Sequence, residues 1–335
     1  MQKISNKPVK TYAIGFEESG YDETDHAKKI AAHLGTDHHE HYLGPKDALD
    51  VIPKLPDIYD EPFADTSAIP TMLVSKMAAQ HVTVTLSGDG GDELFHGYGS
   101  HLWANRLSNS YISAFKGVIG NVLSLGNSRL QRIGCLFQAN PNLQAHIFSQ
   151  EQYLFSDSEL TDLLNIELPS PWLPHLPLSK RKLTPAEIQA IFDTKYYLPN
   201  DLLTKVDRAS MQYSLETRVP LLDHRVLEYS VNLSSDLKIK NGESKYLLKQ
   251  VLYDYVPKKY FDRPKWGFSI PIRFWLQNEL KYLPDKYLSE NVLAKYGIFN
   301  IAQVKEIERR YFAGEDYLFN KIWAIILLNQ WLENN

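Results

Sequence analysis

Three acids and three glycines follow one another in the stretch SGDGGDELF (residues 87–95), directly after the apolar run HVTVTL. Asp89, Asp92 and Glu93 offer hard oxygen donors, and Mg²⁺ usually takes one or two carboxylates together with phosphate oxygens. The glycines let the backbone approach a ligand closely or adopt positive φ. The spacing matches neither a Walker A loop nor an EF-hand. The pattern therefore favours a site for Mg²⁺ and phosphate over a tight turn with a solvated acidic patch.

A second charged stretch, TKVDRASMQYSLETRVPLLDHR (residues 204–225), carries more charge than a buried helix should. We expect a helix that ends before Pro220, because proline has no N–H to donate. Arginine binds carboxylates in a bidentate manner, so this stretch is either an ion-paired structural corner or a charged wall that recognises a carboxylate. The residues alone leave both open.

The HHEH motif at residues 38–41 raises the question of a metal site. Alternate residues of a strand face opposite sides, so His38 and Glu40 share one face while His39 and His41 share the other. Neither face supplies the third ligand that a zinc site needs. We therefore expect no metal site here.

Strand and helix signals alternate over the first hundred residues. Runs rich in β-branched and aromatic residues predict strands, and apolar spacing of three and four predicts helices. This alternation predicts an α/β fold with a parallel sheet covered by helices on both faces, and it places the acids at the carboxyl end of a strand, where such sheets bind ligands. After Tyr98 helical spacing dominates. The predicted strands are 9–16, 38–43 and 81–88, and the predicted helices are 26–35, 47–55 and 71–80.

Composition limits the classes of partner. The formal net charge is −4 and no long basic run is present, so nucleic acid is not a favoured partner. Cys135 is the single cysteine, which allows no disulfide within the chain and favours a cytoplasmic location. The longest apolar run, IWAIILLNQWL (residues 322–332), is too short to span a bilayer, so we expect a buried helix and no membrane partner.

Several segments taken together resemble the synthetase domain of glutamine-hydrolysing asparagine synthetases: SGDGGDELF followed by GY, DEPFADTSAIPT, YLPNDLLTKVDRASMQYSLETRVPLLD, ESKYLLKQ and RPKWGFSIP. The likeness covers nearly the whole chain and is vague only from Tyr98 to about Pro185. It implies an ATP-pyrophosphatase-type fold, with residues 1–100 forming an incomplete α/β nucleotide-binding part and residues 101–335 a mainly helical part of the same domain. It also implies a reaction in which ATP adenylates the side-chain carboxylate of aspartate, pyrophosphate leaves, and ammonia then displaces AMP.

The resemblance implies roles for individual residues, with ATP and Mg²⁺ as cofactors. Asp89 matches an acid tied to acyl-adenylate formation and ammonia attack, and Asp92 matches the Mg²⁺-binding acid. Lys265 matches the lysine that steadies negative charge on the transferring phosphoryl group. Nucleotide contacts are expected at Ile14, Gly15, Ser87, Gly88 and Gly90, and weaker substrate or ion-pair roles at Asp207, Arg208, Glu216 and Arg218.

Two parts of the family pattern are missing from the sequence. The SGGxDS pyrophosphate loop and the glutaminase domain that provides ammonia would both precede Met1. That loop supplies backbone N–H groups at a helix N-terminus and a second Mg²⁺ acid, so we expect little or no synthesis by this chain alone and an exposed sheet edge. Three interpretations stay open: the C-terminal part of an asparagine synthetase, a ligase for another carboxylate such as a sugar acid, or a non-catalytic chain. A homodimer, or a partner chain that supplies the loop, fits each of them.

Overall fold

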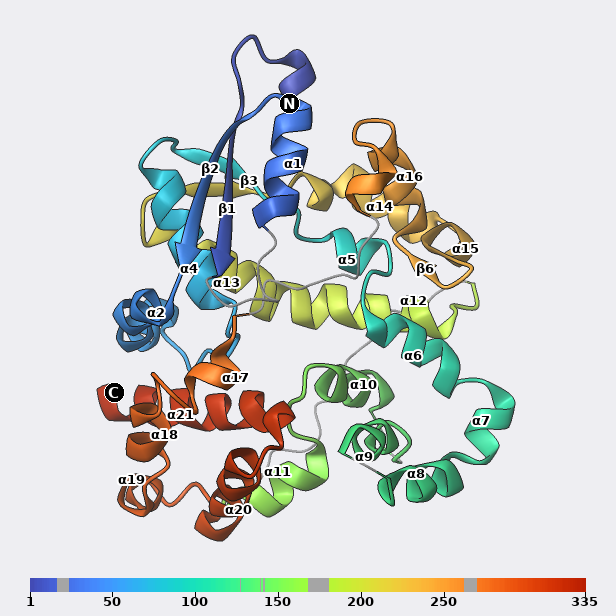
Figure 1. Cartoon of the computed structure of the whole chain (residues 1–335). Helices are drawn as coiled ribbons and strands as arrows, with labels where there is room; N and C mark the ends of the chain where they lie inside the picture. The colour runs from blue at the N-terminus through green and yellow to red at the C-terminus, as the bar shows by residue number, and fades with distance from the viewer. Residues whose placement is uncertain (17–23, 127, 139, 141, 168–180, 262–269) are drawn as a thin grey trace.

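The computed structural model describes residues 1–16, 24–126, 128–138, 140, 142–167, 181–261 and 270–335 (Figure 1). The chain begins with a parallel pair of strands, β1 (Lys10–Phe16) and β2 (Asp37–Leu43), with helix α1 (Thr24–Leu34) between them in sequence. Gly35 follows α1 with a φ of 70°, the left-handed conformation that glycine adopts at helix ends. On β2, His38 Nε2 lies 3.2 Å from Glu40 Oε1. The first two predicted strands, the helix between them and the alternation of faces on β2 are confirmed.

The third strand does not join this sheet. β3 (Val84–Leu86) pairs in parallel with β4 (Glu216–Arg218), so the described residues form separate two-stranded sheets where the sequence predicts one continuous sheet. The strand predicted at residues 81–88 is only three residues long, and Val84 and Leu86 are 39% and 49% exposed. A parallel strand becomes buried only when neighbours and helices cover it. Here β1 and β3 each have one strand neighbour, which leaves one edge of each unpaired by any described strand.

Three strands lie in the part of the chain for which the sequence predicts mainly helices. Besides β4, an antiparallel pair forms from β5 (Ile239–Lys240) and β6 (Glu243–Ser244). Asn241 and Gly242 connect them with positive φ at both residues, as a tight hairpin turn requires. These strands are too short to show a period in sequence, and pairing with a neighbour creates them.

Helices make up most of the rest. In Figure 1 those of residues 99–163 and 272–334 form a lobe beneath the strands, and those of residues 224–253 lie beside the strands. The π-helical segment η3 (Asp193–Leu203) contains Pro199, which cannot donate a backbone hydrogen bond. The other helices are α2 (Pro45–Val51), α3 (Leu55–Tyr59), α4 (Ala68–Ala79), α5 (Gly91–Leu94), α6 (Gly99–Leu107), α7 (Ser110–Ala114), α8 (Lys116–Ser124), α9 (Ser128–Cys135), α10 (Leu143–Glu151), α11 (Asp157–Leu163), α12 (Pro185–Phe192), α13 (Thr204–Met211), α14 (His224–Asn232), α15 (Ser235–Lys238), α16 (Tyr246–Tyr253), α17 (Ile272–Trp275), α18 (Tyr282–Tyr287), α19 (Glu290–Lys295), α20 (Ile301–Phe312) and α21 (Phe319–Asn334).

One large core unites the N-terminal strands with the C-terminal helices. It contains Ile14 from β1, Met72 from α4, Trp275 from α17 and Trp323 from α21, the last three without exposed surface. The apolar run at residues 322–332 lies within α21, as the sequence predicts. Among the described residues, no helix has both the length and the apolar character needed to cross a membrane.

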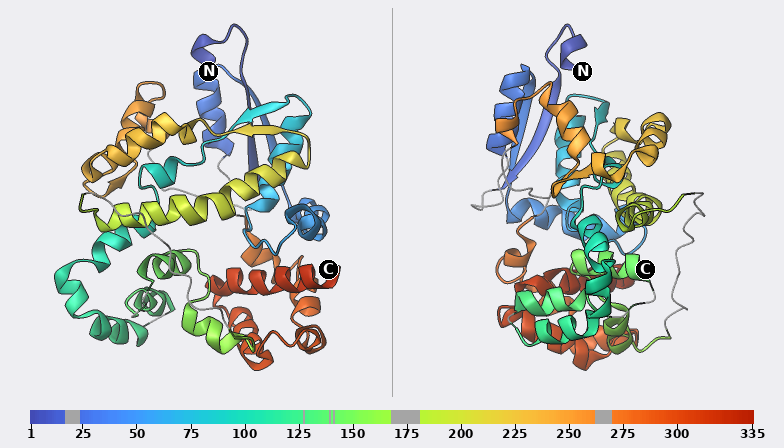
Figure 2. Two further views of the ribbon diagram at one scale, coloured as in Figure 1. Left: turned by 180° about the vertical axis from the view of Figure 1, so that it is seen from behind. Right: turned by 90° about the vertical axis from the view of Figure 1, so that its right-hand side faces the viewer.

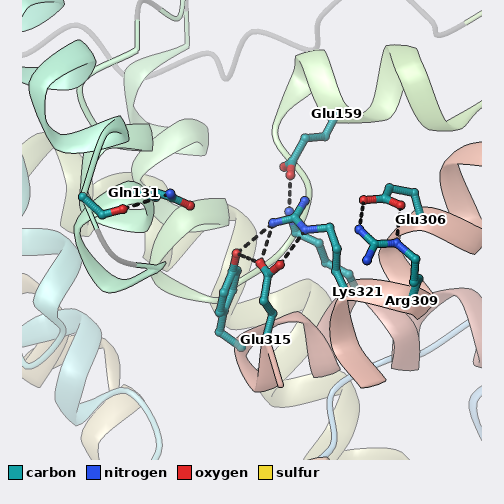
Figure 3. A network of polar contacts seen from close by, with 9 residues as sticks. Gln131, Glu159, Glu306, Arg309, Glu315 and Lys321 are labelled. Carbon is teal, nitrogen blue, oxygen red and sulfur yellow. Dashed lines mark hydrogen bonds and ion pairs between the residues drawn. The ribbon is translucent and has the colours of Figure 1, made fainter. Parts of the chain in front are cut away.

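Ion pairs join α21 to the neighbouring helices (Figure 3). Lys321, almost buried on α21, pairs with Glu159 on α11, while Arg310 on α20 binds Glu315 through two hydrogen bonds. Burial alone would raise the pKa of Glu159, but the positive charge of Lys321 holds that pKa below its usual value. The Lys321–Glu159 pair therefore fixes α11 against α21 (Figure 3).

Candidate active site

A cleft of about 1340 Å³ opens at the carboxyl end of β3. Its walls include residues 9–12 at and before β1 and residues 84–86 of β3, so the unpaired edges of the two parallel sheets both face it. Helix α4 contributes Thr71 and Ser75, while η3 and α13 contribute Asp201 and Lys205. The volume exceeds that of a usual small-molecule pocket, and it is large enough for a nucleotide together with a second small substrate.

The glycine-rich loop after β3 forms one rim of this cleft. Ser87, Gly88, Asp89, Gly90 and Asp92 all line it. The Ser87 hydroxyl donates a 2.6 Å hydrogen bond to Asp89 Oδ2, which fixes the direction of that carboxylate. Gly90 has a φ of 82°, and a Cβ there would lie 2.3 Å from the Leu222 side chain, so only glycine fits. The structure therefore brings these five predicted residues together.

Asp92 forms an ion pair with Lys245, a residue to which the sequence assigns no role. Lys245 Nζ lies 3.0 Å from Asp92 Oδ1, and both side chains are mostly buried. Lys245 adopts a φ of 54° and donates its backbone N–H to the Phe95 carbonyl, which ties the start of α16 to the loop. A Cβ on Gly97 would lie 1.8 Å from Asp92 Oδ1, so the backbone packs closely against the carboxylate. The ESKYLLKQ segment contains this lysine, but its spacing alone does not indicate an acid as its partner.

The two loop carboxylates are the donors that could hold a metal. In the part of the chain that the structure describes, no group of three or more His, Cys, Asp and Glu side chains is arranged to hold a metal ion. Asp89 and Asp92 on one rim suit Mg²⁺, which commonly takes one or two carboxylates and completes its shell with phosphate oxygens and water. The donor set present fits Mg²⁺ that arrives with a phosphate-bearing substrate.

A third acid of the same loop is buried. Glu93 is 1% exposed and accepts a 2.6 Å hydrogen bond from the Tyr98 hydroxyl, and both residues line the cleft. Burial raises the pKa of Glu93 above its usual value. The Glu93–Tyr98 pair therefore anchors the far end of the loop.

The opposite wall is built on a buried lysine. Lys205 on α13 is 7% exposed, and its Nζ donates 2.7 Å hydrogen bonds to Asp65 Oδ2 and Ser67 Oγ. Burial alone would raise the pKa of Asp65, but the adjacent ammonium group holds it below its usual value. The charge density of this stretch favours an exposed Lys205, whereas the structure buries it. Leu202 and Ala209 are buried on either side of it, and their spacing puts Lys205 on the buried face.

The four weaker candidates lie outside the cleft. On α13, Lys205 points inward, so Asp207, two residues on, points to the opposite side. Thr217 of β4 lines the cleft, and its two neighbours face away because strand side chains alternate. The exposed side chains form ion pairs instead: Arg208 lies 2.8 Å from Asp60, and Arg218 lies 2.7 Å from Glu216.

Ile14 and Gly15, the remaining predicted residues that the structure describes, are not part of the lining. Ile14 is 6% exposed in the main core, and neither Ile14 nor Gly15 lines the cleft, whereas Thr11 and Tyr12 of the same strand do. The expected contact of Ile14 and Gly15 with adenine stays a prediction. Lys265 lies outside the described residues.

Asp201 gives the cleft a pH-dependent contribution to stability. Burial and the negative charge of Asp65 raise the pKa of Asp201 to about 8. An unfolded Asp loses its proton near pH 3.9, so between about pH 4 and pH 8 the folded state binds more protons and this group's contribution to stability falls as the pH rises. We expect Asp201→Asn to increase the free energy of unfolding by about 1 kcal/mol or more at pH 9 relative to its effect at pH 5.

Urea unfolding of wild type and variant at both pH values measures this difference. Asp207→Asn, an exposed change on the next helix, is the matched control and is expected to show no such dependence. Equal effects of Asp201→Asn at the two pH values would contradict the raised pKa.

Comparison of the sequence with known proteins shows the family to which the chain belongs. The family model described as "Asparagine synthase" matches residues 1–333. The chain is 32% identical over 339 residues to "Asparagine synthetase [glutamine-hydrolyzing] 1" of Bacillus subtilis (96% of this chain, 52% of the relative). It is 29% identical over 337 residues to "Putative asparagine synthetase [glutamine-hydrolyzing]" of Mycobacterium tuberculosis (97% and 51%). For "Asparagine synthetase [glutamine-hydrolyzing]" of Homo sapiens the identity is 26% over 333 residues (93% and 45%). The chain spans about half the length of the curated relatives it matches.

Proposed function

Because the chain belongs to the asparagine synthase family, we propose that it is the synthetase half of an ATP-dependent carbon–nitrogen ligase that converts aspartate to asparagine. ATP transfers AMP to the side-chain carboxylate of aspartate and releases pyrophosphate, and ammonia then displaces AMP to form the amide. A glutaminase domain supplies the ammonia. The observation that carries this proposal is the convergence of Ser87, Gly88, Asp89, Gly90 and Asp92 on one rim of a nucleotide-sized cleft.

Each loop residue has a role in this proposal. Asp92 and Asp89 hold Mg²⁺, which when bound neutralises charge on the phosphate oxygens. Ser87 orients Asp89, and Lys245 orients Asp92, through the contacts described above. Asp89 acts at acyl-adenylate formation and ammonia attack, and Lys265 steadies negative charge on the transferring phosphoryl group.

The phosphate-binding element of the site comes from outside the described residues. The unpaired edges of β1 and β3 both face the cleft, and backbone N–H and C=O groups on such edges favour the addition of a strand. We propose that a further strand, from another segment of the protein or from a partner chain, pairs with these edges and ends in a loop whose N–H groups bind pyrophosphate. Calorimetry should then show weak or no binding of Mg²⁺-ATP to residues 1–335 alone.

The experiment that tests the function uses residues 1–335 combined with that segment. The mixture contains Mg²⁺, ATP, aspartate labelled with ¹⁸O in its side chain, and ammonium chloride, which removes the need for glutamine hydrolysis. We expect asparagine, pyrophosphate and AMP in equal amounts, with one ¹⁸O atom transferred to AMP. Formation of ADP and phosphate, or AMP without the label, would exclude an acyl-adenylate.

A ligase that acts on another carboxylate is the second candidate. It is favoured by the position of the four charged residues expected to recognise the substrate, since Asp207, Arg208, Glu216 and Arg218 all lie outside the cleft lining. Offering glutamate and uronic acids in place of aspartate, with pyrophosphate release as the readout, separates the two functions. If neither aspartate nor any of these acids leads to release of pyrophosphate, the result favours a non-catalytic chain.

A further inference from the structure

An uncovered apolar face runs along α7 and α8. Four large apolar side chains at successive spacings of three, four and three residues lie on one side of α8 and the residues that flank it, since such spacings return to the same side of a helix. The separate helix α7 carries a fifth exposed apolar side chain. All five are between 60% and 88% exposed: Tyr111, Phe115, Val118, Val122 and Leu125. Figure 1 and the left view of Figure 2 place α7 and α8 at the outer rim of the helical lobe.

The same two helices have a second apolar face, and that one is covered. Ile112, Ile119 and Leu123 pack against a small core cluster around Leu107 and Ile147. The two helices are therefore packed against the protein through this second face, and the exposed apolar face points away from that contact. Serine, asparagine and glycine fill most of the remaining positions of residues 108–128.

Charge is distributed unevenly along the sequence that contains this face. Residues 94–150 contain no Asp or Glu but four cationic residues, whereas the rest of the chain has 32 Lys and Arg against 40 acids. A segment of net charge +4 thus belongs to a protein of net charge −4. The four cations are Arg106, Lys116, Arg129 and Arg132.

We propose that α7 and α8 bind the surface of an anionic lipid membrane. The apolar face enters the headgroup region, and the acid-free segment around it is attracted to the negative surface potential, as in helices that lie flat in the interface. This proposal departs from the sequence-based expectation of no membrane partner, which considered only a spanning segment, because here only one face of the helices leaves water. It is also independent of the proposed ligase chemistry.

A second copy of the chain fits this face less well. Residues 115–125 form a face about 15 Å long and about 10 Å wide, far smaller than the roughly 800 Å² per partner of a stable dimer. Two such segments would also bring like charges together. A lipid surface meets neither problem, since it is flat, fluid and negative.

Flotation of the full chain with vesicles tests the proposal. We expect about tenfold more protein bound to vesicles of phosphatidylcholine with phosphatidylglycerol than to phosphatidylcholine alone. The double variant Val118→Ser/Val122→Ser should reduce that binding about tenfold, because two inserted side chains lose their apolar surface. The matched control is Val231→Ser/Val251→Ser, which changes two similarly exposed valines elsewhere and should bind like wild type.

Circular dichroism of each variant checks that the helices are retained. A second readout places tryptophan on the face: Phe115→Trp should show a blue shift of its emission only with anionic vesicles. Equal binding of both double variants would overturn the proposal. So would a wild-type dimer in light scattering that Val118→Ser/Val122→Ser converts to a monomer, because that result assigns the face to a second copy.

Discussion

Asp92→Asn is expected to raise the Mg²⁺ concentration for half-maximal amide formation about tenfold to a hundredfold in the complete enzyme. The change keeps the size of the side chain but removes the negative charge from the cleft rim. It also leaves the Lys245 ammonium, 3.0 Å from Asp92 Oδ1 in the wild type, without that carboxylate to balance it. The unbalanced positive charge near the cleft rim weakens cation binding further. Pyrophosphate release as a function of Mg²⁺ concentration, at constant ATP, measures the effect.

The matched control is Asp254→Asn, the same change at the exposed end of α16. It should leave the Mg²⁺ dependence unaltered. Glutamine hydrolysis, which needs no ATP, should stay the same in both variants. An Asp92→Asn enzyme with the wild-type half-saturating Mg²⁺ concentration would remove Asp92 from the metal site.

The second large effect concerns stability. Lys205→Met is expected to lower the free energy of unfolding by about 3–5 kcal/mol, because it leaves the buried Asp65 carboxylate without its cation. Lys205 is 7% exposed and its Nζ donates to both Asp65 and Ser67, so water cannot replace the lost contacts without opening the wall of the cleft. Urea unfolding monitored by circular dichroism measures the loss.

Lys249→Met provides the comparison. Lys249 pairs with Glu243 at 3.1 Å, but both side chains are about one-third exposed, so we expect a loss of at most about 1 kcal/mol. The double variant Lys205→Met/Asp65→Leu should recover part of the stability lost in Lys205→Met, since it removes the uncompensated charge. Equal losses of unfolding free energy in Lys205→Met and Lys249→Met would show that the buried Lys205–Asp65 pair contributes no more to stability than an exposed pair.

Local sequence signals predicted the elements that depend on neighbouring residues. The β-branched run of β1, the Gly35 stop after α1 and the apolar composition of α21 each act through contacts within a few residues or through burial of one long helix. The Asp89–Asp92 loop was likewise predictable, because its glycines and acids are contiguous. The family membership implied by the segments that resemble asparagine synthetases is confirmed by the match over residues 1–333.

Features that depend on distant pairing were not predictable. Lys205 and Asp65 are 140 positions apart, and β3 pairs with β4 across a similar separation. In the structure Lys205 shares a buried face with Leu202 and Ala209, but residue spacing does not indicate which acid makes burial of a lysine possible. The division of the strands into separate sheets was not predictable either, because an apolar run does not reveal how many strands pair with it.

The sequence by itself identified the residues of the loop and the family, because both depend on residue types at short, contiguous spacing. Only the tertiary structure decided which charges face the cleft. A one-residue difference in strand position turns Thr217 inward and Glu216 and Arg218 outward, and the phase of α13 buries Lys205 while exposing Asp207. These orientations depend on how each element packs against distant parts of the chain, and that packing is fixed by the shape of the whole core.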